Sequence, residues 1–206
     1  MTQKAVVVID CGYFEMINNY LQHNRGKKIS FEKFSNKLCE GRIHLRTRIY
    51  HAYPYKSDNP TKNEEEAYSK KMKFFYAINR IPKHEFVPVG RVIPENIRCK
   101  VCKKNFEDRK QKGVDVAIAL DLVRMAQKRF ADIFLIVCGD EDLSDAVSMA
   151  QENPCNVIVY YCYDRNYGIF GSKKLYNTAS DRVQMDLDFL EECAMDTTKV
   201  TTLPVK

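Results

Sequence analysis

Three uninterrupted apolar runs constrain the fold of this 206-residue chain more than any other feature. They occupy residues 5–9, 133–138 and 157–162. Runs without polar alternation are typical of strands that are buried on both faces, as in parallel sheets covered by helices. Because helix-like segments separate the runs, we predict a three-layer α/β domain with a central, mostly parallel sheet.

The remaining elements follow from periodicity and from capping residues. Further strands are predicted at residues 42–53, 86–93 and 182–187, and Pro88 indicates that the second of these lies at a sheet edge. Ser30 is a candidate cap for the helix that follows it. Helices are predicted at residues 13–22, 30–39, 64–80, 113–130, 142–151 and 172–179, with a last one from residue 188.

Composition indicates one domain. A hydrophobic content of 45% is enough for one sizeable core. We therefore expect a single domain over residues 1–195 and a loose C-terminal tail over residues 196–206. Residues 97–112 are polar, strongly basic and cysteine-containing, and we interpret them as a small excursion from that core.

The compartment is inferred from what the sequence lacks. It has no apolar stretch long enough for a transmembrane helix and no charged segment followed by an apolar one, as a signal peptide would have. Two of the eight cysteines, Cys138 and Cys162, lie in apolar strand-like runs and are expected to be core residues. A reducing, cytoplasmic setting without membrane contact is the expectation.

Four aspartates lie at the ends of predicted strands or the starts of predicted helices. Asp10 closes the first apolar run, Asp140 follows the second, and Asp115 and Asp142 begin helices. An aspartate by itself is more often a helix cap or a turn residue. However, the carboxyl ends of parallel strands share one edge, so these four side chains are placed to converge.

Converging carboxylates repel one another unless a cation neutralises them. Mg²⁺ and Mn²⁺ prefer carboxylate and water ligands, and in phosphodiester cleavage such ions activate water and hold the phosphate. None of the four histidines lies in the acidic segments, which gives a histidine-based mechanism little support. We therefore predict a metal-dependent reaction on phosphate.

The acidic segments resemble the NYN family of PIN-like ribonucleases over residues 4–190. The matching pieces are Val-Val-Val-Ile-Asp10-Cys-Gly-Tyr, Lys112-Gly-Val-Asp115-Val, Val-Cys-Gly-Asp140-Glu-Asp142 and Ser180-Asp181-Arg-Val. The resemblance implies a PIN-like sheet with strand order 3-2-1-4-5. It also implies an endoribonuclease whose Mg²⁺ or Mn²⁺ site is formed by Asp10, Asp115, Asp140 and Asp142.

One position departs from the family pattern. Many members carry an asparagine three residues after the first aspartate, where this chain has Tyr13. Tyr13 is a candidate for stacking on a base or simply a packing residue. The resemblance also brings Lys112 beside the second motif, where it could approach a phosphate or be an ordinary loop lysine.

A basic surface is predicted around the excursion. Net charge is +6, from 33 basic and 27 acidic residues, which is compatible with a polyanionic partner. Basic side chains on such an element would neutralise a nucleic-acid backbone without reading its sequence. The candidates for RNA contact are Lys103, Lys104, Arg109, Lys110 and Lys112, and a second basic cluster is Arg42, Arg46 and Arg48.

Cys99 and Cys102 have the spacing of half a zinc site. A tetrahedral Zn²⁺ needs two more ligands, from elsewhere in this chain or from a second copy in a homodimer. The alternative is two free cysteines in a loop. A redox pair is a weaker alternative, because a thioredoxin-type redox motif lies at the start of a helix that follows a strand.

Competing functions remain open on the sequence. The main alternative is a catalytically inactive PIN-like module that binds RNA or a protein partner. Paired acids after a strand also occur in Toprim-type domains, although those need a glutamate where this chain has Asp10. No glycine-rich nucleotide-binding motif is present. RNA is the expected substrate, and the sequence leaves DNA cleavage undecided.

Overall fold

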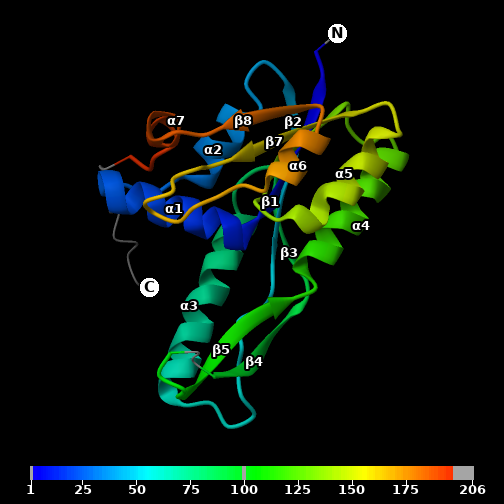
Figure 1. Ribbon diagram of the computed structural model, residues 1–206. Helices are drawn as coiled ribbons and strands as arrows, with labels where there is room; N and C mark the ends of the chain where they lie inside the picture. Colours follow the sequence, from blue (N-terminus) through cyan, green and yellow to red (C-terminus); the bar gives the residue numbers. More distant parts are fainter. Residues whose placement is uncertain (1, 99–100, 197–206) are drawn as a thin grey trace.

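A sheet of six parallel strands forms the centre of the molecule (Figure 1), in the computed structural model that describes residues 2–98 and 101–196. The strand order is β3-β2-β1-β6-β7-β8, and every adjacent pair runs parallel. When the six strands of this sheet are numbered one to six along the chain, their order is 3-2-1-4-5-6. The expected order 3-2-1-4-5 is therefore confirmed, with one additional strand at the edge. The strands are β1 (Lys4–Asp10), β2 (Ile43–His51), β3 (His84–Pro88), β6 (Ile133–Val137), β7 (Asn156–Tyr161) and β8 (Asp181–Gln184).

Helices cover both faces of the sheet, which gives the predicted three layers. The apolar run of β1 shows why both faces must be covered. Ala5, Val7 and Ile9 are buried in one core cluster, and Val6 and Val8 are buried in the other. One face carries α1 (Cys11–Arg25), α2 (Phe31–Leu38), α3 (Lys62–Asn79) and α7 (Leu187–Glu192); the other carries α4 (Val114–Gln127), α5 (Ser144–Gln151) and α6 (Lys173–Thr178).

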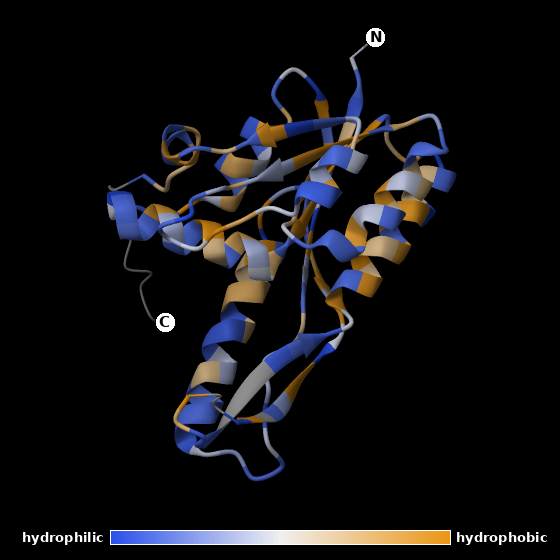
Figure 2. Cartoon of the chain, in the orientation of Figure 1, coloured by the Kyte–Doolittle hydropathy of each residue, from blue (hydrophilic) through white to orange (hydrophobic). Residues whose placement is uncertain are grey.

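Local capping explains where several helices begin. The Ser30 hydroxyl accepts a hydrogen bond from the Lys33 amide, as the sequence predicts for the start of α2. Thr61 and Glu64 form a reciprocal capping box at the start of α3. Figure 2 shows hydrophobic residues along the strands and on α4 and α5. No helix in residues 2–98 or 101–196 is both long and apolar enough to cross a membrane.

A two-stranded antiparallel ribbon projects beside α3 (Figure 1). It consists of β4 (Arg91–Arg98) and β5 (Asn105–Lys112), so the predicted excursion is the larger part of it. The prediction of one strand over residues 86–93 is wrong, because β3 ends at Pro88 and the chain turns at Gly90. Gly90 has a φ of +68°, and a Cβ there would lie 2.1 Å from the Lys112 carbonyl oxygen. Only glycine fits this crossing.

Candidate metal and nucleic-acid site

An acidic cavity of about 590 Å³ opens at the carboxyl edge of the sheet. Asp10 ends β1, Asp140 follows β6, and Asp115 lies in the first turn of α4; all three line this cavity. From β1 the chain continues to β2 and β3 on one side of the sheet, and it later returns to form β6 on the other side of β1. The cavity therefore lies at the topological switch point of the sheet. Ligands of open α/β sheets bind there.

Each of these aspartates stands where a helix begins. The Asp10 Oδ1 accepts a hydrogen bond of 2.9 Å from the Gly12 amide at the start of α1. The Asp140 Oδ1 accepts one of 3.0 Å from the Asp142 amide at the start of the 3₁₀ turn η1 (Glu141–Leu143). Helix starts carry partial positive charge, which lowers the cost of gathering carboxylates.

Negative charge in the cavity is nevertheless poorly compensated. Burial raises the pKa of Asp10 to about 6, and the Asp115 charge adds to this rise while the Gly12 amide opposes it. The pKa of Asp115 is raised as well, first by burial and then by the charge of Asp140. The described lining residues include four carboxylates, with Glu141 as the fourth, and no lysine, arginine or histidine.

Asp142 lies at the margin of this arrangement. It is exposed in η1 and is absent from the described cavity lining, yet its charge raises the pKa of Asp115. The Ser180–Asp181 segment is placed differently. Asp181 begins β8, which puts it at the amino edge of the parallel sheet, away from the cavity.

The wall of the cavity is rigid around Tyr13. Its phenol is 6% exposed; its hydroxyl donates to the Cys162 carbonyl oxygen at 3.3 Å and accepts from the Cys162 amide at 3.0 Å. A Cβ on Gly139 would lie 2.5 Å from the Tyr13 ring, so this position requires glycine. Tyr13 thus lines the cavity as a packed, hydrogen-bonded residue, and contact with a base stays a prediction.

The predicted basic contacts lie on the ribbon. Lys103 and Lys104 are exposed between β4 and β5, Lys112 is exposed at the end of β5, and Lys110 pairs with Glu95 at 2.8 Å. Arg109 pairs with Pro94 in the strand register. Of the predicted zinc pair, Cys102 is exposed in the turn after β4 and Cys99 lies outside the described residues, so that prediction is untested.

A second potential donor cluster lies beside Asp10. Cys11, Glu15 and His51 each place one ligand atom within 4.8 Å of the others. The His51 Nδ1 is 2.6 Å from the Ala52 carbonyl oxygen, which leaves Nε2 facing the cluster. Lys71 forms an ion pair with Glu15, so an ammonium group already balances the carboxylate.

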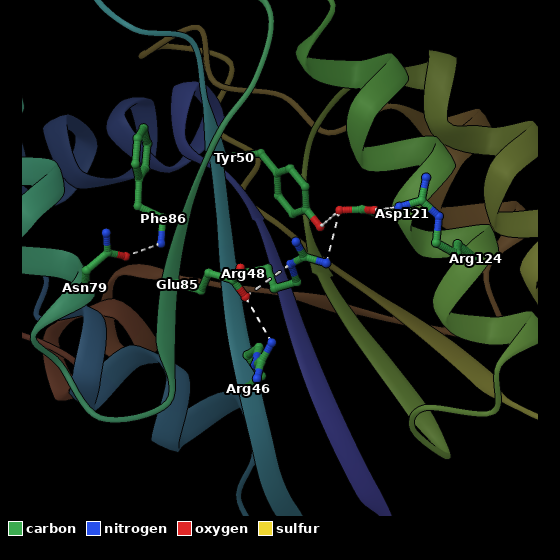
Figure 3. Close-up of polar contacts among 8 residues, drawn as sticks. All are labelled: Arg46, Arg48, Tyr50, Asn79, Glu85, Phe86, Asp121 and Arg124. Atoms are coloured by element: carbon green, nitrogen blue, oxygen red, sulfur yellow. Dashed lines mark hydrogen bonds and ion pairs between the residues drawn. The ribbon is translucent and has the colours of Figure 1, made fainter.

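Two members of the predicted second basic cluster, Arg46 and Arg48, lie on β2 and are engaged within the protein (Figure 3). The third, Arg42, precedes β2 and donates to the Leu38 and Glu40 carbonyl oxygens at 3.4 Å. Arg46 bonds to Glu85 at 3.2 Å, and Arg48 pairs with Glu85 at 3.6 Å and with Asp121 at 3.1 Å. Asp121 also accepts from the Tyr50 hydroxyl at 3.0 Å and pairs with Arg124. Because their partners are already present, Arg46 and Arg48 are structural residues.

Three of the cavity residues were not among the predicted site residues. Glu141 stands between two predicted ligands, and the sequence offered it only as a less certain candidate. Phe170 lies in the loop after β7, at the carboxyl edge where ligands bind. Gln111 comes from β5 and reaches His51 and the Ala52 amide, at 3.4 and 3.2 Å. No local pattern marks Gln111, because only the ribbon's docking brings it to the cavity.

A parallel sheet with helices on both faces and an acidic cavity at its switch point is consistent with the PIN-like form of the α/β fold. The NYN domain model matches residues 4–183, and the chain belongs to the NYN family, whose fold is that of PIN-like nucleases.

A solved structure supports the fold. The crystal structure of a protein of unknown function from Vibrio parahaemolyticus RIMD 2210633 is similar, with a TM-score of 0.57 and 17% identity. The match covers 94% of this chain and 97% of that one, and at this identity it concerns the fold alone. Comparison with curated proteins gives no significant match.

Proposed function

We propose that the protein is a metal-dependent endoribonuclease that hydrolyses phosphodiester bonds of RNA at an Mg²⁺ or Mn²⁺ site. Asp10, Asp115, Asp140 and Asp142 would supply the carboxylate ligands. One observation carries the proposal: acidic side chains from β1, α4 and the β6–η1 loop line one cavity without a described basic neighbour in its lining. PIN-like nucleases typically use divalent metals, which fits this charge.

The donor set suits a hard divalent ion. The described lining offers carboxylates, which such ions prefer over sulfur or nitrogen ligands. When bound, the ion would activate a water, hold the phosphate and stabilise the leaving oxygen. The chain's own contribution is orientation: the Gly12 and Asp142 amides hold the Asp10 and Asp140 carboxylates at the cavity.

The ribbon supplies the proposed RNA contacts. Lys103, Lys104, Arg109, Lys110 and Lys112 would bind phosphates along the strand that leaves the cavity, a sequence-independent contribution. Lys112 is the nearest to the cavity in sequence, because Gly113 and α4 follow it directly. The proposal also includes a Zn²⁺ held by Cys99 and Cys102 and a homodimer built around it. Metal analysis of the purified protein tests this part.

The experiment is a cleavage assay on RNA with Mn²⁺, comparing wild type with Asp140→Asn. We expect the variant to lose cleavage while it still binds RNA. Asp145→Asn is the matched control, because Asp145 is exposed on α5, close in sequence but outside the described lining. A DNA strand of the same sequence, assayed in parallel, decides the sugar specificity.

The second candidate function is an inactive module that binds RNA or a protein partner. Tyr13 favours it, because the hydroxyl bonded to Cys162 cannot orient a water or substrate as an asparagine at this position could. Wild-type protein that binds RNA but cleaves none with Mg²⁺, Mn²⁺ or any other divalent ion would establish the module and refute the nuclease.

A further inference from the structure

Two exposed aromatic rings stand on the loop between β7 and α6. Phe170 is 48% exposed and Tyr163 is 53% exposed, and their rings meet edge to face with centroids 5.7 Å apart. Phe170 also lines the acidic cavity together with Asp10, Asp115 and Asp140. The two rings therefore stand on a loop that forms part of the cavity wall.

The loop that carries these rings is firmly held. The Asp164 Oδ1 accepts from the Asn166 and Tyr167 amides at 2.8 and 3.0 Å, and its Oδ2 accepts from the Tyr20 hydroxyl at 3.0 Å. Ile169 is fully buried in the core. The exposure of Phe170 and Tyr163 is thus imposed by a closed turn with a buried anchor.

Phe170 is also tied to the acidic loop. The Ser172 amide donates to the Gly139 carbonyl oxygen at 3.0 Å. A Cβ on Gly139 would lie 2.9 Å from the Phe170 carbonyl oxygen, so the two backbones are in close contact. Since Gly139 directly precedes Asp140, the backbone that carries Phe170 is held close to the candidate metal ligands.

The neighbouring tyrosines are less open. Tyr167, in the same loop, packs against Tyr20 with ring centroids 5.1 Å apart and is 36% exposed, and Tyr161, at the end of β7, stacks on Tyr176 of α6 at 4.5 Å. Phe170 and Tyr163 are the most exposed aromatic residues of the loop, and Phe170 lines the cavity.

We infer that Phe170 and Tyr163 form a stacking subsite for an unpaired nucleobase of the RNA strand whose phosphate lies at the aspartates. This inference rests on the proposed function and adds its substrate preference. Base stacking on aromatic side chains tolerates any base, and its strength follows stacking area, which ranks purines above pyrimidines. A paired base has both faces covered by its neighbours, so the subsite selects single-stranded RNA.

The test measures stacking directly. A single-stranded RNA of about ten nucleotides carries 2-aminopurine, whose fluorescence falls on stacking, and it binds protein that carries Asp140→Asn so that cleavage does not consume it. In that background Phe170→Leu should abolish the quenching and weaken single-strand binding at least about fivefold. Tyr163→Leu should act in the same direction with a smaller loss, and Phe170→Trp should retain both signals.

Two comparisons make the result decisive. Phe130→Leu removes a phenylalanine of similar exposure, 43%, from the segment before β6 at the other edge of the sheet, and it should change nothing. A duplex of the same sequence should bind Phe170→Leu and its parent equally.

Unchanged quenching and affinity in Phe170→Leu would overturn the subsite, as would an equal loss for single strand and duplex. A patch that docks protein instead of RNA would produce the first of these results. The nuclease proposal would survive either one, because it fails on a different observation, the absence of cleavage by the wild-type protein.

Discussion

Asp115 and Asp121 lie on the same helix, yet the protein treats their charges in opposite ways. Asp121 is bonded to Tyr50, Arg48 and Arg124 (Figure 3). Asp115 faces Asp10 and Asp140 across a cavity whose described lining has no basic residue, and its pKa is raised. A partly buried acid with a raised pKa and no basic partner beside other carboxylates is a candidate ligand for a cation.

The same contrast separates the two basic regions. Arg46 and Arg48 on β2 are bound to acids of the protein, whereas Lys103, Lys104 and Lys112 on the ribbon extend to solvent. Net charge alone could not distinguish them. A metal ion would complement the acidic cavity, and a polyanion bound to that ion would complement the exposed ribbon lysines.

The largest expected effect is on RNA cleavage, and it comes from comparing aspartate-to-asparagine substitutions at the two α4 positions, Asp115 and Asp121. Asp115→Asn should lower Mn²⁺-dependent RNA cleavage by at least about a hundredfold, because a metal ligand contributes several kcal/mol of charge stabilisation. Asp121→Asn should leave the rate per folded molecule within about twofold and lower stability instead. Equal losses of cleavage in the two variants would remove the distinction between these acids.

Arg48→Met should destabilise the protein by about 2 kcal/mol, below the range for a fully buried pair, because it removes the less exposed of the two guanidinium groups that pair with Asp121. Arg48 and Asp121 are 19% and 16% exposed in their side chains. Arg46→Met, on the same strand but half exposed, is the control and should cost less than about 1 kcal/mol. Urea unfolding measures both, and adding Asp121→Asn to Arg48→Met should recover part of the loss.

Asp10→Asn should stabilise the metal-free protein by about 2 kcal/mol at pH 7.5, since the raised pKa reports a carboxylate that folding disfavours. The folded pKa of about 6 exceeds the ordinary value of 3.8, so the penalty is absent below about pH 4 and complete above about pH 6. The gain should therefore shrink when unfolding is repeated at pH 4. A gain of equal size at both pH values would show that the Asp10 charge is not its source.

The smallest effect is on metal affinity. A cation needs Asp10 ionised, so Mn²⁺ affinity should rise about tenfold from pH 5 to pH 7 as this carboxyl titrates near pH 6. Calorimetry in buffers of different ionisation enthalpy should detect the released proton at pH 5.5. Asp10→Asn should bind Mn²⁺ more weakly and lose this pH dependence; a flat wild-type profile would mean that Asp10 is not a ligand.

Much of the fold could be predicted because its signals are local. The run at residues 5–9 identifies a doubly buried strand, and Ser30 identifies the start of α2. The strand expected over residues 86–93 was wrong because Pro88 and Gly90 end one element and the chain starts another at Arg91. Both parts have extended character, and only the pairing of β4 with β5 separates them from the sheet.

The candidate site divides in the same way. Asp10 and Asp140 could be placed from the strands they follow, since strand ends of a parallel sheet share an edge. Gln111 and Phe170 could not, because their approach to the cavity depends on how the ribbon and the β7–α6 loop dock. Asp142 was expected among the ligands, and it stands just outside the described lining.

The sequence by itself determined that this chain forms a helix-covered parallel sheet with aspartates at one edge, because burial periodicity and strand ends depend on a few neighbouring residues. Only the tertiary structure decided which charged side chains have no partner of opposite charge within the protein. Whether an acid meets an arginine, as Asp121 meets Arg48, depends on segments far apart in the chain, and electrostatic compensation is a property of distance in space.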